Sequence, residues 1–350
     1  MLLTFGRMLL LAALDACEIG ERDRWTHIHG ERYMKALQLP AVATLVLGLL
    51  LSACTSADDQ EDTTLKIALL PIVDTLPFYV AEQNGYFADE RIQVELLPVK
   101  SPTERDALMQ ANEVDGMLTD LPGVGVFNRD EPQVKIISLA RKAYANAPLF
   151  RVLAAPNSEI QDVADLSGVK IGISQNTVIE YITDRMLQQS GLDASQIAIE
   201  EITAIPVRFE QLMAGQIPAA TLPDPLAQGA VAAGAKLIVD DSQFTDFSQS
   251  VLVFSTSAIE SKRSTLEKFM AAWRRAVADL NNDPGAYGDL LIEKGRVPES
   301  IQGSFNMPPF PDNEITSESQ WSDVVVWLLE KDLVSRDIPY DEAVDPSFLE

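Results

Sequence analysis

Histidine and cysteine, which often serve as bases, nucleophiles and metal ligands, are confined to the beginning of this chain. The only histidines are His27 and His29, and the only cysteines are Cys17 and Cys54. A chain that matures at residue 54 therefore lacks Ser-His triads, Cys-His pairs and zinc sites of the His/Cys kind. We predict no catalytic residue, no metal site and no cofactor.

Carboxylates and hydroxyls are the remaining side chains that could bind a ligand, and several of them follow predicted strands. These residues are Asp74 and Thr75, Thr119 and Asp120, and Asp224. In open parallel sheets, ligands bind beyond the carboxyl ends of the strands, beside helix N-termini. Each residue either contacts a ligand there or has a local function. Asp74 or Thr75 would cap the helix that Pro77 begins, and the others would form turns beside proline.

A second polar cluster occurs farther along the chain. It consists of Ser174, Gln175, Asn176 and Thr177, with Tyr181 one turn inside the following helix. We expect ligand contacts here, because capping needs only one of the four polar residues. Ser101 is the weaker equivalent and favours a cap. Either Phe78 or Tyr79 should face the ligand site, and a flat ring of the ligand would stack on that aromatic side chain.

Arginines are a further possible set of ligand contacts. Arg105, Arg141, Arg151 and Arg208 would pair with an anionic ligand if they reached the site. Isolated arginines usually lie on the surface, and we expect the same of these.

Alternating strands and helices must position these residues. The expected elements are strands at 66–71, 92–99, 116–119, 169–173, 197–202 and 219–222, and helices at 77–83, 102–112, 177–189, 207–214 and 264–280. The repeated order predicts an α/β fold of two similar lobes with mainly parallel sheets. We assign residues 65–152 with 253–350 to lobe 1 and 153–252 to lobe 2. Strand-like segments 149–154 and 251–255 would form the two hinge crossings.

Composition excludes several classes of protein. The 350 residues include 27 Lys and Arg against 52 Asp and Glu, a net charge of −25. A nucleic-acid-binding protein is therefore not expected, because phosphate contacts need a basic face. The 47% hydrophobic fraction with 23% charged residues is typical of a folded protein of about two domains.

The N-terminal region is typical of an export signal. Met34-Lys35 precedes an apolar run at 36–51, which ends in Leu51-Ser52-Ala53-Cys54. This ending resembles the bacterial lipoprotein box and implies that Cys54 is the lipidated first residue of the mature protein; the alternative is a simple anchor helix. We expect translation to begin at Met34, residues 1–53 to be untranslated or signal sequence, and 54–64 to be a flexible tether outside the cytoplasm.

Two motifs resemble one family of transport proteins. The first is Pro77-Phe78-Tyr79-Val80-Ala81, continuing to Gly85-Tyr86-Phe87, and the second is Leu166 to Gly172. Both are similar to elements of ABC-importer solute-binding proteins for sulfonates, taurine, nitrate, thiamine precursors and riboflavin. The resemblance implies a monomer with a periplasmic binding protein-like fold of type 2, a small-molecule ligand, and a permease with its ATPase as partners. At 222–225, the aromatic residue of many relatives is absent.

Carboxylates beside aromatic rings favour a nitrogen heteroaromatic ligand, either riboflavin or a thiamine pyrimidine precursor. A sulfonate, taurine or nitrate is the alternative within the same class, although nearby carboxylates would repel it. Two other functions stay open. One is an enzyme that uses Asp120 and Asp224 as an acid/base pair, and the other is a sensor that presents the solute to a membrane receptor.

Overall fold

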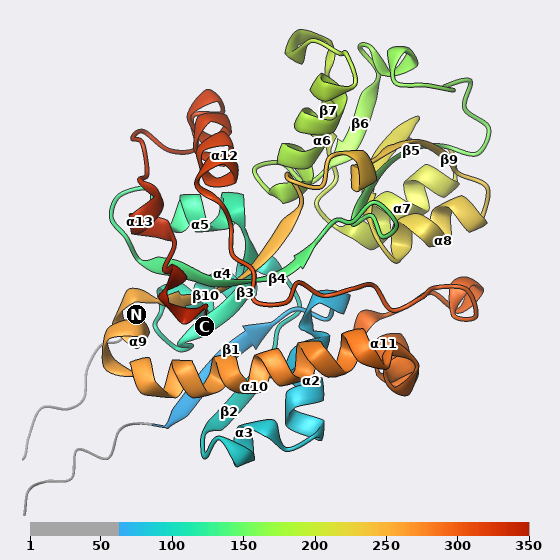
Figure 1. Cartoon of the computed structure of the whole chain (residues 1–350). Coiled ribbons are helices and arrows are strands. Elements are labelled where there is room, and N and C mark those ends of the chain that lie inside the picture. Colours follow the sequence, from blue (N-terminus) through green and yellow to red (C-terminus); the bar gives the residue numbers. More distant parts are fainter. Residues whose placement is uncertain (1–62, 350) are drawn as a thin grey trace, which may run out of the picture. The chain divides into compact units, whose positions relative to one another are not determined.

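The computed structural model describes residues 63–349, which lie within one compact unit, Glu61–Glu350. The predicted signal segment, the predicted lipidation site Cys54 and most of the predicted tether lie outside the described residues. Two five-stranded sheets form the framework, and each belongs to a separate lobe (Figure 1). Among residues 63–349, no helix has both the length and the apolar character needed to cross a bilayer.

The first sheet has the strand order β2-β1-β3-β10-β4. Its strands are β1 (Thr64–Leu69), β2 (Gln93–Pro98), β3 (Gly116–Asp120), β4 (Val134–Lys142) and β10 (Gln249–Ser255). β1 pairs in parallel with β2 and β3, whereas β10 is antiparallel to both of its neighbours. Four of the five strands therefore run in the same direction.

The second sheet repeats this pattern with the order β7-β6-β8-β5-β9. Its strands are β5 (Phe150–Ala154), β6 (Lys170–Ile173), β7 (Ala198–Glu201), β8 (Ala219–Pro223) and β9 (Lys236–Asp240). Here β5 is the single antiparallel strand. The predicted α/β fold of two similar lobes with mainly parallel sheets is confirmed.

Helices connect the strands and cover both faces of each sheet. They are α2 (Leu76–Gln83), α3 (Tyr86–Asp89), α4 (Pro102–Gln110), α5 (Leu121–Phe127), α6 (Val178–Gln189), α7 (Ile205–Met213), α8 (Leu226–Ala232), α9 (Thr256–Ser261), α10 (Arg263–Asn282), α11 (Gly288–Gly295), α12 (Glu318–Glu330) and α13 (Tyr340–Ala343). Short 3-10 turns include η1 (Val73–Thr75) and η4 (Asp241–Gln243).

The two faces of each sheet bury different cores, because side chains alternate along a strand. On the first sheet, Ile67 packs with the α2 and α10 side, whereas Met117 packs with the α5 and α12 side. Figure 1 shows α10 and α12 on opposite sides of this sheet. Gly125 allows α5 to approach α12 closely, since a Cβ there would lie 2.2 Å from a methyl carbon of Leu328.

The chain crosses between the lobes at residues 143–149 and 241–248. β5 lies wholly in the second sheet and β10 wholly in the first, so the boundaries expected at 152/153 and 252/253 fall inside strands. The strand-like sequences at 149–154 and 251–255 do not indicate which sheet each strand joins. The crossings are instead the segments that directly precede β5 and β10.

We predict that Trp273→Ala lowers the free energy of unfolding by about 3–5 kcal/mol, the usual cost of removing a large buried aromatic side chain. Trp273 is 2% exposed and packs edge-on against Phe78, with ring centroids 4.9 Å apart. Urea denaturation measures the change. Val326→Ala is the control, because Val326 is 47% exposed; an equal effect of the two substitutions would contradict the assigned core.

Candidate functional site

The predicted site residues lie at the edge of each sheet where the parallel strands end, which we call the first edge and the second edge. Both crossings join one edge to the other, because β4 ends at the first edge and the antiparallel β5 begins at the second. The crossings have seven and eight residues, which limits each span to roughly 25–30 Å. The two edges are therefore held on the side of each sheet where the lobes are joined.

Hydrogen bonds tie the two crossings to each other. The amide of Ala143 donates to the carbonyl of Ser248 at 3.3 Å. Asp241, which has no exposed surface, accepts hydrogen bonds from the amides of Leu149 and Phe150 at 2.9 and 3.1 Å. Burial is the main cause that raises the pKa of Asp241 to about 6. A buried carboxylate from one crossing thus fixes the point at which the other crossing enters β5.

Four polar residues from four segments lie at the first edge. Ser250 of β10 stands opposite Asp120 of β3 on one side and Arg141 of β4 on the other. Partners in antiparallel pairs point to the same face, so these three side chains share one face. Asp74 of η1 reaches this group, with its carboxylate 3.7 Å from Nη1 of Arg141.

Asp120 combines a local function with an altered acidity. Its carboxylate caps α5 by accepting a hydrogen bond from the amide of Gly123 at 2.8 Å. Burial raises the pKa of this carboxyl, and the positive charge of Arg105 opposes the shift. A carboxyl shifted toward its neutral form offers one O–H donor together with a carbonyl acceptor.

Several buried polar atoms at this edge have no hydrogen-bond partner within the described residues. They are Nε of Arg141, Oγ of Ser250 and Oγ1 of Thr119. Leaving such atoms unpaired costs about 1–3 kcal/mol each, so this is a place where a ligand with polar groups gains affinity. The guanidinium of Arg141 lies 5.8 Å from the ring centroid of Phe310. Tyr144, half-buried in the first crossing, has a pKa raised to about 12, mainly by burial.

At the second edge, Asp224 is already paired. Arg151 donates to both of its carboxylate oxygens, from Nε at 3.0 Å and from Nη2 at 2.8 Å. The amide of Gln228 also donates to this carboxylate. Arg151 lies 3.9 Å from Asp240 as well. Asp224 was expected either to contact a ligand or to form a turn; in the structure it neutralises Arg151 and orders the turn at the start of α8.

The polar cluster at 174–177 forms the turn between β6 and α6. Thr177 caps α6 and donates its hydroxyl hydrogen to the carbonyl of Ser174. Asn176 is exposed, has a positive φ of 60°, and its amide bonds to Glu180. Ser174 accepts a hydrogen bond from Arg208 at 2.9 Å. Within residues 63–349, the partly buried side chain of Gln175 makes no hydrogen bond, which leaves it available.

Some candidate residues lie away from these groups. Phe78 is fully buried against Phe269 and Trp273, so it is the member of its pair that packs inward. Tyr79 lies under Lys294 of α11, whose Nζ is 4.8 Å from the ring centroid. Two other candidates have local functions: Thr75 bonds to the carbonyl of Ile72, and Ser101 caps α4.

Tyr181 belongs to an interface between the lobes. It is 1% exposed, and its hydroxyl donates to Asp323 of α12 at 2.7 Å. Lys331 lies 2.7 Å from Glu180 and 2.8 Å from Asp184. The indole of Trp327 also donates to Asp184. Tyr181 was expected in the site because it follows the polar cluster by one helical turn. The sequence alone does not distinguish a side chain that bonds to a neighbouring helix from one that faces a ligand.

Four arginines were named as possible anion contacts but were expected on the surface. That expectation was wrong: Arg105, Arg141 and Arg208 are buried, and Arg151 is nearly so. Ser250 and Tyr144 were not considered. Sequence position could have indicated that Arg141 and Arg151 lie near the site, because both are at or beside the ends of apolar segments, immediately next to the crossings.

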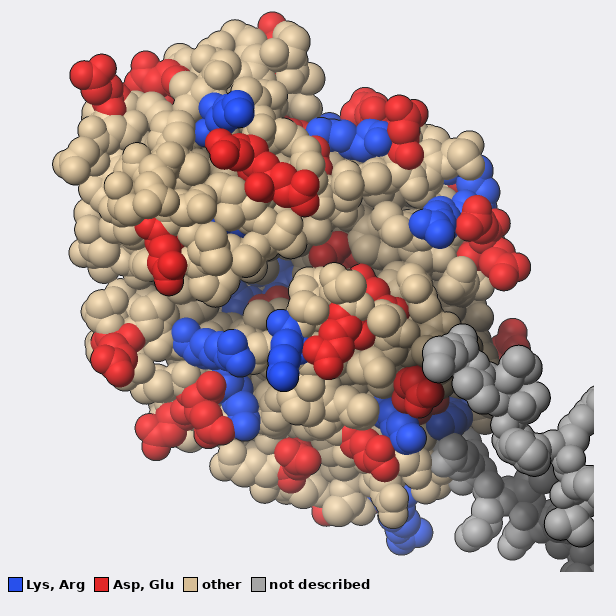
Figure 2. All heavy atoms as spheres, turned by 180° about the vertical axis from the view of Figure 1, so that it is seen from behind, with Lys and Arg blue, Asp and Glu red and all other residues tan. Residues whose placement is uncertain are grey.

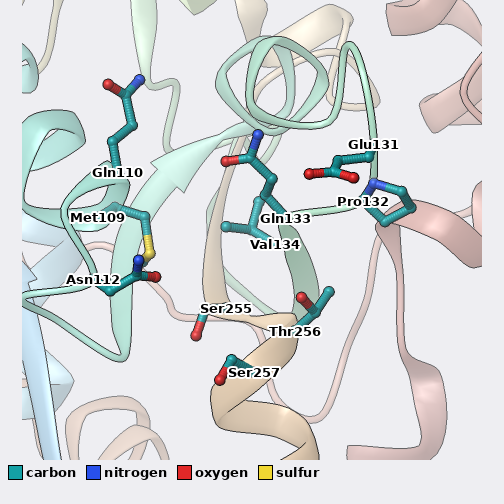
Figure 3. A pocket seen from close by; sticks show the side chains of 10 residues that line it. All are labelled: Met109, Gln110, Asn112, Glu131, Pro132, Gln133, Val134, Ser255, Thr256 and Ser257. Carbon is teal, nitrogen blue, oxygen red and sulfur yellow. The ribbon is translucent and has the colours of Figure 1, made fainter.

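The molecule also has depressions on its surface. Figure 2 shows a hollow near the middle of the face, with Lys or Arg atoms and Asp or Glu atoms inside it. A separate depression of about 320 Å³ includes Val134 and Ser255 in its lining (Figure 3). It lies at the opposite edge of the first sheet, because β4 starts and β10 ends there. In the part of the chain that the structure describes, no cluster of three or more His, Cys, Asp or Glu residues forms a metal site.

Comparison with known proteins identifies the family. Residues 73–286, more than half of the chain, match the family described as NMT1/THI5 like. The chain belongs to the NMT1/THI5-like family. The match begins at η1 and includes both crossings and the whole second sheet, while β1 lies before it.

Curated relatives of this NMT1/THI5-like protein are distant. It is 27% identical over 175 residues to a formylaminopyrimidine-binding protein of Halalkalibacterium halodurans, covering 48% of this chain and 51% of the relative. It is 26% identical over 160 residues to a putative thiamine biosynthesis protein of Haemophilus influenzae, covering 45% and 49%. The chain thus spans about half the length of these curated relatives. A putative ABC transporter periplasmic binding protein of Brachyspira hyodysenteriae is 23% identical over 268 residues, 69% and 73% of the two chains.

Solved structures share the fold. The periplasmic aliphatic sulphonate binding protein of Escherichia coli superposes with a TM-score of 0.68 at 16% identity, over 81% of this chain and 92% of the other. The alkanesulfonate-binding protein of Xanthomonas axonopodis pv. citri gives 0.67 at 16% identity, over 81% and 99%. The NMT1/THI5-like chain therefore has the two-lobe fold of periplasmic binding proteins.

The Asp241 carboxylate predicts a pH dependence of stability. Because its folded-state pKa is raised, its contribution to stability is present in full below the unfolded value near 4 and is lost as the pH rises through about 6. We expect the unfolding free energy of the wild type minus that of Asp241→Asn to fall between pH 4 and pH 7 in urea titrations. Asp246→Asn, on the exposed side of the same crossing, controls for charge loss; a pH-independent difference for Asp241→Asn would refute the assignment.

Proposed function

We propose that this chain is an extracytoplasmic solute-binding lipoprotein that captures a small aminopyrimidine, such as a thiamine precursor, and delivers it to an ABC importer. The observation that carries the proposal is the group at the first edge. Asp120, Ser250 and Arg141 are register neighbours there, Asp74 lies beside Arg141, and Nε of Arg141 and Oγ of Ser250 have no hydrogen-bond partner in the described chain. Such a group supports binding without requiring any chemical step.

The first edge suits an aminopyrimidine because of the donors and acceptors it presents. The edge of this heterocycle carries an amino donor beside a ring-nitrogen acceptor. The carboxyl oxygens of Asp120 would accept a hydrogen bond from the amino group, and burial, which raises the pKa of this carboxyl, favours the protonated form whose O–H would donate to the ring nitrogen. The half-buried ring of Tyr144, close enough to Arg141 for that charge to affect its pKa, supplies an aromatic surface for stacking.

The relatives give this ligand class further support. One curated relative is named for binding formylaminopyrimidine and another for thiamine biosynthesis. Both names concern pyrimidine chemistry, whereas no relative described above is named for riboflavin. We therefore favour the pyrimidine over riboflavin as the solute, and we keep riboflavin as a comparison in the experiment.

A sulfonate is the second candidate solute. Arg141 has an unpartnered Nε, and two solved structures with this fold are named for binding sulfonates. Against it, Asp74 lies beside that guanidinium and would repel a sulfonate placed there. The acid/base pair considered for an enzyme is disfavoured, since Arg151 already holds Asp224 from two nitrogens.

Membrane attachment through Cys54 is part of the proposal. The cysteine lies outside the described residues, and its support is the Leu51-Ser52-Ala53-Cys54 sequence. Such an anchor would hold the two lobes close to a permease, and a sensor that presents the same solute to a receptor would need it equally. The presence of a permease gene and an ATPase gene beside the coding sequence would distinguish these two functions.

Calorimetric titration of the purified protein tests the ligand class. We expect (4-aminopyrimidin-5-yl)methanol to bind, and taurine, nitrate and riboflavin to bind more weakly or not at all. Arg141→Met should weaken the binding of this probe about tenfold or more, the usual loss for a hydrogen bond to a charged group. Arg129→Met, which removes an exposed arginine of the same lobe, is the matched control. Tight binding of taurine alone would refute the pyrimidine proposal.

Replacing Cys54 tests the anchor. We expect Cys54→Ser to move the protein from the membrane fraction to the soluble fraction, because the proposed lipid is attached to the sulfur of Cys54. Binding of the pyrimidine probe should be unchanged. Retention of the variant in the membrane fraction after a high-salt wash would argue for a simple anchor helix instead.

A further inference from the structure

Arg208 of α7 is buried at the second edge in an unusual setting. It has no exposed surface, and its aliphatic stem lies over Gly172 of β6, where a Cβ would come within 3.3 Å of its Cδ. Its Nη1 donates to Oγ of Ser174 at 2.9 Å and to the carbonyl of Ile202 at 2.7 Å. Ser174 and Ile202 are the residues that directly follow β6 and β7, so the guanidinium lies where these strands end.

This guanidinium has no counter-ion among the described residues. No ion pair joins it to a carboxylate within 63–349, and both Nε and Nη2 are buried without a hydrogen-bond partner. Burial alone lowers the pKa of Arg208 to about 10. Burying a cation without a counter-ion is costly, and charged side chains are almost never fully buried unless they are paired.

Arg151, at the same edge, shows how the Nε and Nη2 atoms of an arginine bind when a carboxylate is present. Its Nε and Nη2 form parallel hydrogen bonds to the two oxygens of Asp224. The corresponding atoms of Arg208 offer the same fork, whose spacing matches two oxygens of a carboxylate, sulfonate or phosphate. The two arginines differ in that the chain supplies an oxyanion to Arg151 and supplies none to Arg208.

We propose that the Nε and Nη2 edge of Arg208 binds an anionic group of the transported solute, such as a carboxylate, sulfonate or phosphate. This inference rests on the proposed function and extends it: the solute carries an anionic group in addition to its amino-heterocycle. The heterocycle binds the first edge, and the anionic group binds the second. Because Arg208 has no exposed surface here, entry of the oxyanion requires a local opening at the 174–177 turn or α7.

Two probes that differ only in the anionic group test this. We would titrate 4-aminopyrimidine-5-carboxylate and (4-aminopyrimidin-5-yl)methanol into the wild type and Arg208→Met. Arg208→Met should weaken the carboxylate about 10- to 100-fold and leave the alcohol within about twofold. Lys170→Met, which removes an exposed cation at the other end of β6, should change neither affinity. Taurine and inorganic phosphate, titrated alongside, distinguish the kinds of oxyanion.

The outcomes separate this inference from the proposed function. Equal effects of Arg208→Met on both pyrimidines, or none on either, would overturn the Arg208 assignment and leave a pyrimidine-binding protein. If only taurine or phosphate binds, and binding needs Arg208, the oxyanion site stands and the pyrimidine proposal fails. Failure of every oxyanion probe to bind the wild type would overturn the Arg208 site.

Thermal unfolding without ligand distinguishes binding from a structural function. Removal of an unpaired buried cation should leave the Tm of Arg208→Met equal to or above that of the wild type. Arg208→Lys keeps the charge but loses the fork, so it should fold and bind the carboxylate at least about tenfold more weakly. A lowered Tm for Arg208→Met, combined with unchanged carboxylate affinity for Arg208→Lys, would make Arg208 a structural residue and overturn the inference.

Discussion

The short length of the two crossings is the constraint on which the candidate site depends. Segments 143–149 and 241–248 connect strand ends only, and they are bonded to each other through Ala143 and Ser248 and through Asp241. Every strand that runs with β4 or β9 must therefore end on the side where the lobes are joined. The loops that follow these strands are thereby gathered in one region, although they come from widely separated parts of the sequence.

Much of this framework was predictable from sequence because it depends on local patterns. β-branched and leucine-rich runs placed β1, β3, β6 and β8 within a few residues, and apolar spacing placed α10. β4 and β9 were missed, since charged residues and crossing segments surround them. β2 was placed correctly as a strand, but its position at the edge of the sheet, with several exposed residues, was not predicted. Which strand lies at an edge depends on the order of the sheet, which no local pattern encodes.

The site was predicted less well, for a physical reason. Sequence identifies carboxylates and hydroxyls at strand ends, but it does not show which partner each one takes. Asp224 is satisfied by Arg151, and Thr177 by its own turn, whereas Ser250 is unsatisfied. Arginines were assigned to the surface because their charge is costly to bury alone. That cost is reduced for Arg151 by Asp224 and remains for Arg208, and such differences arise only from tertiary contacts.

The packing of α6 on α12 has a consequence for how the lobes are joined. Lys331 of this interface pairs with Glu180 and Asp184. The Tyr181 hydroxyl bonds to Asp323, and the second crossing joins the interface where Phe247 meets the ring of Tyr181 edge-on and Gln320 reaches Asp246. Residues 318–331 therefore act as a third connection between the lobes, made of side chains instead of backbone. The stiffness of the joint is set in part by the C-terminal region, so a truncation or bulky fusion there would change the hinge without touching either crossing.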